Sequence, residues 1–283
     1  MQQNFRKLNT TLASQVGLMG LPNSMLPDVI FTIAPIQYAC YNATDKKEKE
    51  IPAMRYNAET IASFIDAAVL APQLSFDEAR AQTLQAIEAK CKTVCVRPCS
   101  LDMTTELCRG TETKVSVVLG FPHGDQTTET KVAEARDTMR RRPFEVDMVG
   151  NIGLVRSGAM EVYESEVRAV AEAVHDGGAR LKVILEISQL TSEQIAEATR
   201  ACIRAGADFV KTSTGFTGGG ATIEAVQTML AAADGKIEVK ASGGIRSYEE
   251  AVGFIEMGCT RLGVGVGSLK AILSGGGLAG EGY

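Results

Sequence analysis

Residues 206–220 read GADFVKTSTGFTGGG, and this stretch indicates how the whole chain folds. Phe209 and Val210 predict a buried strand, and the glycines from Gly215 onward predict a loop at its end. Lys211 lies between strand and loop, although a buried ammonium is costly unless it is paired or deprotonated. The stretch therefore predicts a strand and a following loop, with a lysine near the carboxyl end of the strand.

Further short apolar runs have the same character, and helical signals separate them. The predicted strands cover residues 63–70, 93–98, 115–122, 145–153, 182–188, 208–215, 236–244 and 261–267. Ser or Thr followed three residues later by Glu or Gln predicts helix starts at Ser75, Thr191 and Ser247. Eight apolar strands alternating with helices favour a parallel sheet closed as a TIM (β/α)8 barrel. A doubly wound open sheet is the alternative.

The first part of the chain differs from the alternating part. Residues 1–55 contain prolines, polar residues and a charged run at 44–50, without a long helical period. We expect residues 1–55 to form an N-terminal extension, partly packed or flexible, and residues 56–283 to form the barrel with a short C-terminal tail. Residues 1–27 contain basic but no acidic side chains, so a transit peptide is the alternative for this segment.

Composition and charge exclude several classes of function. The 283 residues carry a net charge of −5, which argues against nucleic-acid binding, and no apolar run is long enough to span a membrane. Seven cysteines without a CxxC pair, together with only two histidines, argue against a metal site and favour a reducing compartment. We therefore expect a cytoplasmic protein with no metal, no nucleic acid and no membrane partner.

Three predicted strands carry a charged residue inside an apolar run, toward their carboxyl ends, where TIM barrels perform catalysis. These residues are Asp147, Lys211 and Lys240. Lysines on consecutive strands would be neighbours, and each would make protonation of the other costlier, so that the pKa of one falls. A neutral amine can attack a carbonyl to form a Schiff base, and a nearby carboxylate can move protons. The pattern favours a Schiff-base aldolase without a cofactor; a structural salt-bridge cluster is the alternative.

Glycine-rich loops follow the last two predicted strands. SGGIRS (242–247) and GVGVGS (263–268) each precede a predicted helix, and glycine backbones with helix N-termini favour a bound phosphate. The loop that begins at Gly215 lies on the same predicted face. The remaining candidate anion-binding residues are Gly243, Gly244, Arg246, Gly265, Gly267 and Ser268. Plain tight turns are the alternative.

Several of these motifs, taken in order, resemble the deoxyribose-phosphate aldolases, which are class I aldolases. The resemblance covers roughly residues 58–275 and rests on ADFVKTSTGF, LGFPHG (119–124), EVDMVGNIGLVRSG (145–158), LKVILE (181–186) and VKASGGIR (239–246). It implies a TIM barrel that reversibly cleaves 2-deoxy-D-ribose 5-phosphate to D-glyceraldehyde 3-phosphate and acetaldehyde. It also implies a small phosphorylated sugar or aldehyde as the partner, and we expect a homo-oligomer, either a dimer or a tetramer.

The resemblance also implies roles for individual residues. Lys211 would form the Schiff base, Asp147 and Lys240 would move protons and tune Lys211, and Asp66 would support that relay. Further roles fall to residues that the resemblance alone selects: Cys95 in the pocket, Thr214 on a substrate hydroxyl, and Tyr283 as an aid to proton transfer from a mobile tail. A solvated tail without a catalytic role is the alternative for Tyr283.

Two departures from the family pattern affect these expectations. The family usually has His-Thr-Leu-Leu-Lys after the first aspartate, where this chain has AAVLA (67–71). The family usually has serines after the eighth strand, where this chain has GVGVGS with only Ser268. The second departure favours one alternative, a Schiff-base aldolase for a different or unphosphorylated aldehyde. A further alternative is an inactive barrel kept as a binding or scaffold protein, with the unusual N-terminus as its interaction segment.

Overall fold

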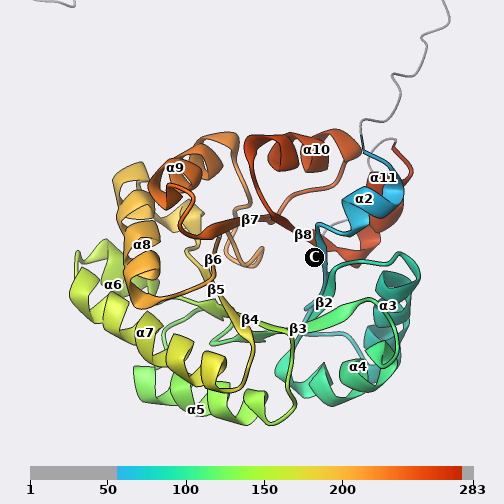
Figure 1. Ribbon diagram of the computed structural model, residues 1–283, viewed down its shortest axis with the longest axis horizontal. Coiled ribbons are helices and arrows are strands. Elements are labelled where there is room, and N and C mark those ends of the chain that lie inside the picture. The colour runs from blue at the N-terminus through green and yellow to red at the C-terminus, as the bar shows by residue number, and fades with distance from the viewer. Residues whose placement is uncertain (1–55, 276–283) are drawn as a thin grey trace, which may run out of the picture. The chain divides into compact units, whose positions relative to one another are not determined.

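The computed structural model describes residues 56–275 as a closed barrel of eight parallel strands (Figure 1). The strands pair in chain order, and β8 closes the barrel against β1. This confirms the predicted TIM barrel and excludes the open sheet. The strands are β1 (Ile65–Val69), β2 (Thr93–Val96), β3 (Lys114–Leu119), β4 (Glu145–Val149), β5 (Arg180–Ile184), β6 (Phe209–Lys211), β7 (Glu238–Ser242) and β8 (Arg261–Gly265).

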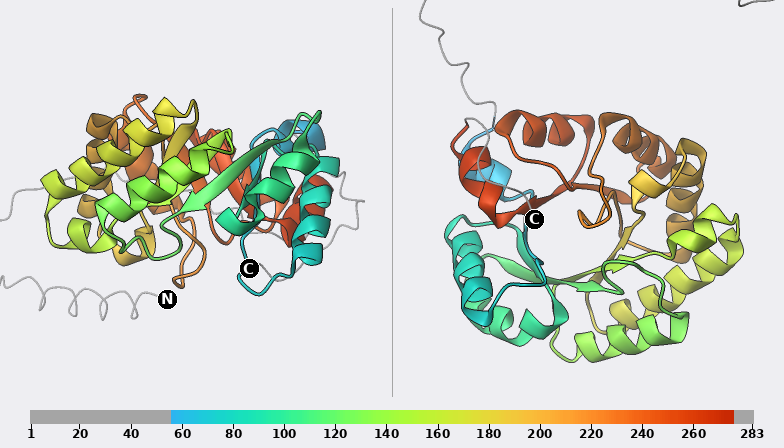
Figure 2. Two further views of the ribbon diagram at one scale, coloured as in Figure 1. Left: turned by 90° about the horizontal axis from the view of Figure 1, so that it is seen from below. Right: turned by 180° about the vertical axis from the view of Figure 1, so that it is seen from behind.

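Helices surround the sheet on its outside, as Figure 2 shows from two further directions. The α-helices are α2 (Ala58–Ala62), α3 (Phe76–Glu88), α4 (Leu101–Cys108), α5 (Thr128–Met139), α6 (Ile152–Arg156), α7 (Met160–Asp176), α8 (Ser192–Ala205), α9 (Ile223–Ala233), α10 (Tyr248–Met257) and α11 (Leu269–Leu273). Short 3-10 turns follow β2, β5 and β8: η1 (Pro98–Ser100), η2 (Ile187–Gln189) and η3 (Val266–Ser268). Capping boxes at Ser75, Thr191 and Ser247 begin α3, α8 and α10, which confirms all three predicted helix starts.

The strands alternate between two environments, because successive side chains of a strand point to opposite faces of the sheet. In β4, Val146 and Met148 belong to the apolar layer between sheet and helices. Their neighbours Glu145 and Asp147 do not belong to it, although both are completely buried. The same alternation in the other strands fills the inside of the barrel with polar and charged side chains, and these make the candidate site.

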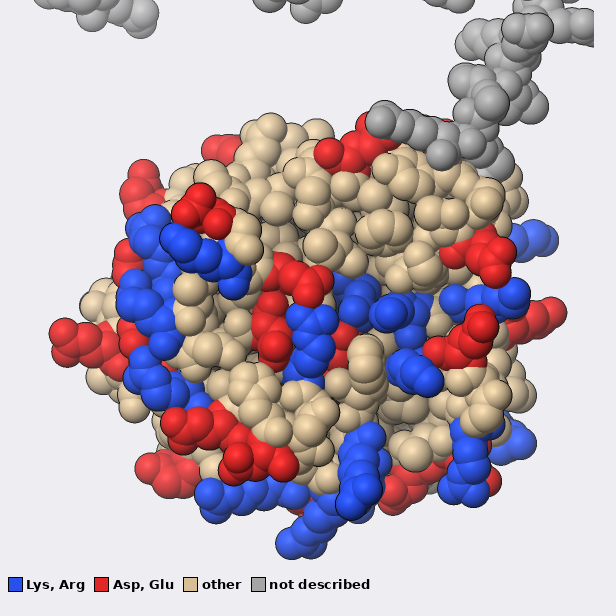
Figure 3. Space-filling view, viewed as in Figure 1, with Lys and Arg blue, Asp and Glu red and all other residues tan. Residues whose placement is uncertain are grey.

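Some expectations concern residues outside the described range of 56–275. The predicted extension at 1–55 and the tail residue Tyr283 both lie there, so those predictions stay open. Within the described residues, none of the helices is long and apolar enough to cross a membrane. Figure 3 shows basic and acidic side chains interspersed over one face of the molecule.

Candidate active site

The three predicted catalytic residues meet inside the barrel. Lys211 on β6 and Lys240 on β7 are paired in register, and the amine of each donates a hydrogen bond to Oδ2 of Asp147 on β4. The distances to that oxygen are 2.9 Å from Lys211 Nζ and 2.8 Å from Lys240 Nζ. All three side chains are buried, and Lys211 is 3% exposed, against 1% for Lys240 and none for Asp147. The structure therefore brings the three predicted residues into contact.

Below this trio lies a layer of buried charges that sequence reasoning missed. Lys182 Nζ lies 2.7 Å from Oδ1 of Asp147 and 2.5 Å from Oε2 of Glu145. Arg261 donates to both oxygens of Glu145, at 2.7 and 2.9 Å, and its Nη1 lies 2.6 Å from Asp66. Lys182 is the third residue of β5 but the first of the strand predicted at 182–188, and Glu145 and Arg261 begin β4 and β8. A charge at the start of a strand is ordinary. Only the register of the barrel shows that they face inward.

Asp66 and Cys95 also lie at this centre, as the resemblance implied. Asp66 accepts a hydrogen bond of 2.5 Å from Lys240 and one of 2.8 Å from Thr93. The Cys95 sulfur lies 3.9 Å from Oδ2 of Asp147. Burial raises the pKa of the Cys95 thiol and the charge of Asp147 raises it further, so the thiol stays protonated. Asp66 therefore links Lys240 to Arg261. Cys95 places an uncharged side chain beside Asp147.

The charges in this cluster are almost balanced. Burial alone would raise the pKa of Asp147, but its three lysine neighbours hold it well below its usual range, so Asp147 is a carboxylate. Burial alone would lower the pKa of Lys211, but the attraction of Asp147 outweighs it and the net direction is upward. The same holds for Lys240 with Asp147 and Asp66. The prediction that one of these two lysines has a lowered pKa is therefore wrong, because the attraction of the carboxylates outweighs burial and the repulsion between the amines.

Among the three lysines that contact Asp147, Lys211 has the fewest carboxylate partners. It has one carboxylate partner, Asp147, whereas Lys240 has two and Lys182 has three. Lys211 is also the most exposed of the three amines. A proton leaves most readily from the amine with the fewest carboxylate contacts, so Lys211 is the nucleophile that this arrangement favours.

Apolar side chains cover one side of the barrel mouth. Ala68, Leu70, Cys95 and Val118 form a buried cluster, and Phe121 and Phe216 pack against it. The two phenylalanine rings meet edge to face with their centroids 5.2 Å apart. This apolar mouth cluster, defined by these six residues, excludes water on one side of the lysines and gives a small aldehyde an apolar surface.

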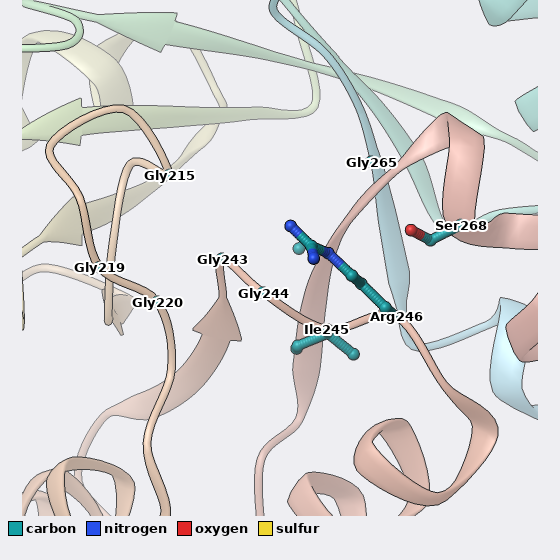
Figure 4. A pocket seen from close by; sticks show the side chains of 10 residues that line it. Gly215, Gly219, Gly220, Gly243, Gly244, Ile245, Arg246, Gly265 and Ser268 are labelled. Carbon is teal, nitrogen blue, oxygen red and sulfur yellow. The ribbon is translucent and has the colours of Figure 1, made fainter. Parts of the chain in front are cut away.

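A separate cavity of about 200 Å³ lies beside the glycine-rich loops (Figure 4). Predicted residues that line it are Gly215, Gly243, Gly244, Arg246, Gly265 and Ser268, and Gly219, Gly220, Ile245 and Gly263 join them. The Arg246 side chain points into the space between the loops, and the described residues offer its guanidinium no ion-pair partner. Gly267 is exposed and does not line the cavity, because η3 turns it outward, so its prediction is not supported.

Thr214 has a different role from the one that the resemblance implied. Its side chain is completely buried and its hydroxyl donates to Glu186 at 2.5 Å. The same oxygen accepts the backbone N–H of Phe216 at 3.0 Å. Because its one donor is used and no part of it is exposed, Thr214 is not available to a substrate hydroxyl in this structure.

The sequence of the barrel matches a known protein family. Residues 60–275 match the model of a family described as "DeoC/LacD family aldolase". The chain belongs to this aldolase family. Deoxyribose-phosphate aldolase of Caldanaerobacter subterraneus subsp. tengcongensis is 42% identical over 208 residues, which cover 73% of this chain and 90% of that protein. Deoxyribose-phosphate aldolase 1 of Bacillus licheniformis is 44% identical over 207 residues, covering 73% and 92%.

Solved structures agree with this assignment. The aldolase QR15 superposes with a TM-score of 0.71 at 37% identity, over 76% of this chain and 94% of that one. A deoxyribose phosphate aldolase from Aeropyrum pernix, described as having a unique tetrameric structure, superposes with a TM-score of 0.71 at 29% identity, over 77% of this chain and 91% of that one. This aldolase therefore shares the family fold over its described barrel, and the protein is a lyase.

Within residues 56–275 no cluster of three or more His, Cys, Asp or Glu side chains is arranged to hold a metal ion. The cysteines of this part are free, and five of the six are buried. Beside the apolar mouth cluster, Lys211 is the amine that the arrangement favours as the nucleophile, and Lys240 is its neighbour on Asp147.

Proposed function

We propose that this aldolase reversibly cleaves 2-deoxy-D-ribose 5-phosphate to D-glyceraldehyde 3-phosphate and acetaldehyde through a Schiff base on Lys211. The observation that supports it most is the pair of lysines that share one oxygen of Asp147. One amine can then act as nucleophile while the other stays charged. The names of its relatives support the substrate.

Covalent chemistry begins when Lys211 gives up its proton. The Asp147 carboxylate, 2.9 Å away, accepts that proton, and the charged Lys240 stays hydrogen-bonded to the same oxygen. The free amine attacks carbon 1 of the open-chain sugar, and loss of water leaves a protonated imine. The C2–C3 bond then breaks: its electrons enter the imine to form an enamine, while the hydroxyl on C3 loses its proton and becomes the aldehyde of glyceraldehyde 3-phosphate.

The second half of the reaction returns the lysine. The enamine takes a proton at C2, and water then adds to the imine and releases acetaldehyde with the free amine. Asp147 is the carboxylate that contacts the Lys211 amine, and Lys240 donates to the same Asp147 oxygen, so they move protons in this proposal. Asp66 holds Lys240 in place at 2.5 Å. Tyr283 could add to this relay only from outside the described residues, and its role remains a prediction.

The glycine-lined cavity is the proposed phosphate site. Its glycine backbone favours an anion, and the Arg246 guanidinium supplies a cation without a competing carboxylate partner among the described residues. Ser268 lines the cavity as its one hydroxyl from the segment after β8. An aldolase for unphosphorylated aldehydes remains the alternative, because the family's usual serines are replaced by glycine and valine there.

Two further parts of the proposal concern the protein's surroundings. A homo-oligomer is supported by the tetrameric Aeropyrum pernix relative. A reducing, cytoplasmic location is supported by the six free cysteines of the described part. Size measurement by light scattering and the thiol count of freshly isolated protein test these two statements.

Cleavage of two sugars tests the proposed reaction. We expect 2-deoxyribose 5-phosphate to be cleaved with a kcat/KM about a hundredfold above that of 2-deoxyribose, since two charge-assisted hydrogen bonds to phosphate account for about 3 kcal/mol. Equal values for both sugars would support the unphosphorylated alternative. No cleavage of either sugar by folded protein would contradict the proposal.

A further inference from the structure

Glu186 is a buried carboxylate that the proposed reaction does not use. It follows β5 at the end of the barrel where Lys211 lies, and it is completely buried. No ion pair of Glu186 occurs among residues 56–275; its side chain accepts hydrogen bonds from Thr214 instead. A carboxylate without a cation is costly to bury, so the contact with Thr214 needs a reason.

The backbone at Glu186 is bent to make this contact. Glu186 has φ 56° and ψ 62°, a left-handed conformation that is unfavourable for a residue with a Cβ atom. Its neighbours on both sides continue the pairing with β6: Leu185 N–H donates to the Lys211 carbonyl at 2.9 Å and Ile187 N–H to the Thr212 carbonyl at 3.0 Å. The bend therefore aims one side chain along the chain that leaves β6, while backbone hydrogen bonds to Lys211 and Thr212 are kept on both sides of it.

The contact controls where the chain goes after Lys211. Oε2 of Glu186 accepts both the backbone N–H of Thr214, at 3.2 Å, and its hydroxyl, at 2.5 Å. The hydroxyl oxygen in turn accepts the N–H of Phe216 at 3.0 Å. Between them lies Gly215, with φ +86° at the wall of the anion cavity. Glu186 thus fixes three successive residues that lead from the lysine strand to the cavity.

The far end of the same loop is fixed to the other wall of the cavity. Ala221 N–H donates to the carbonyl of Gly243 at 3.0 Å. A Cβ atom on Gly220 would lie 2.4 Å from that carbonyl oxygen, so the two backbones touch only because residue 220 is glycine. Figure 4 shows Gly215, Gly219 and Gly220 on this loop across from Gly243 and Gly244.

We propose that Glu186 is a positioning residue that sets the distance between the amine of Lys211 and the phosphate site. The inference rests on the proposed function. Lys211 is placed by β6 and Asp147, whereas the loop from Thr214 to Ala221 forms one wall of the anion cavity. Without the Glu186 carboxylate, Lys211 keeps its hydrogen bond to Asp147, but the loop that begins at Thr214 loses its hydrogen bonds to Glu186. The phosphate then no longer holds carbon 1 of the sugar at the amine.

Kinetics with two substrates test this role, using Glu186→Ala, Glu186→Gln, Thr214→Val and Thr214→Ser. We expect Glu186→Ala and Thr214→Val to raise the KM for 2-deoxyribose 5-phosphate about tenfold, which corresponds to one lost charge-assisted hydrogen bond. Borohydride trapping of acetaldehyde on the enzyme should change less than about twofold, because that step needs no phosphate. Thr214→Ser keeps the hydroxyl and should restore the wild-type KM, and Glu186→Gln should be intermediate.

Controls separate this role from a general loss of structure. Glu193→Ala, an exposed glutamate on α8, should behave as wild type in both assays. Thr214→Val removes one hydroxyl only, so it keeps the test decisive if Glu186→Ala does not fold. Equal loss of trapping and cleavage, or a KM within twofold of wild type in Thr214→Val, would overturn the proposal. Wild-type enzyme that traps acetaldehyde but cleaves no phosphorylated sugar would overturn the substrate proposal instead.

Discussion

Lys211 and Lys240 are paired in register on neighbouring strands, and their amines donate to the same oxygen of Asp147 at 2.9 and 2.8 Å. Two ammonium groups this close would repel each other without the carboxylate between them. The arrangement makes Asp147 the junction of any proton exchange between them. It also makes the two lysines unequal, since Lys240 has Asp66 as a second partner and Lys211 has none.

Replacing Lys240 with methionine should reduce turnover much more than substrate binding. Lys240→Met removes the ammonium that exchanges protons with Asp147, and we expect kcat to fall at least about a hundredfold. The KM for 2-deoxyribose 5-phosphate should change little, because Lys240 does not line the anion cavity. Steady-state kinetics check this, with Lys270→Met on α11 as an exposed control. A kcat near the wild-type value would remove Lys240 from the proton route.

The pH dependence of imine formation should respond to Asp147. Attack needs the neutral amine, so the rate of borohydride trapping should rise with pH toward the raised pKa of Lys211. Asp147 is the chief attraction that raises this pKa, and without it burial and the neighbouring lysines lower it. In Asp147→Asn, the trapping profile should therefore shift to lower pH while cleavage of the sugar is lost. An unchanged profile, or a shift to higher pH, would show that Asp147 does not hold the proton on Lys211.

Arg246 should discriminate between phosphorylated and unphosphorylated substrates. Arg246→Ala removes a cation that points into the glycine-lined cavity, and the KM for 2-deoxyribose 5-phosphate should rise about tenfold or more. Cleavage of 2-deoxyribose should not change, because that sugar has no phosphate. Arg246→Lys keeps the charge, and its KM for the phosphorylated sugar should lie between those of wild type and Arg246→Ala. Arg156→Ala, at the exposed end of α6, is the control. The same loss with both sugars would mean that the cavity does not bind phosphate.

Lys131 should contribute to the free energy of unfolding, although it does not contact Lys211, Lys240 or Asp147. Its buried amine donates to the carbonyls of Gly124 and Val149 and to Glu166, at 2.7, 3.0 and 2.9 Å. Lys131→Met leaves Glu166 buried without its cation, and we expect the free energy of unfolding to fall by about 3 kcal/mol. Urea denaturation measures this, with exposed Lys114→Met as the reference. A loss below about 1 kcal/mol would show that the pair is as dispensable as a surface ion pair.

The barrel could be predicted because each strand is a short apolar run between helix signals. The ends of the strands could not. The run at 208–215 was expected as one strand, but β6 ends at Lys211. Residues 212 to 214 stay buried after the ladder ends, and their small hydroxyl side chains, two of them β-branched, resemble a strand in sequence.

The grouping of Asp147, Lys211 and Lys240 could be predicted because each of them interrupts an apolar run. Glu145 and Arg261 could not, since each begins a strand and a charge there is equally typical of an exposed end. The resemblance assigns Thr214 to the substrate, but its hydroxyl is bonded to Glu186. That contact depends on a left-handed backbone conformation at Glu186, which no local sequence pattern predicts. Contacts between strands, rather than residue types, decide these assignments.

The central claim is that Lys211 forms the covalent imine. Incubation with acetaldehyde and borohydride, followed by intact and peptide mass spectrometry, tests it on wild type and Lys211→Ala. We expect one ethyl adduct on the peptide that contains Lys211, and no adduct on that peptide in the variant. An adduct on Lys240 instead, or no adduct on folded wild-type protein, would contradict it.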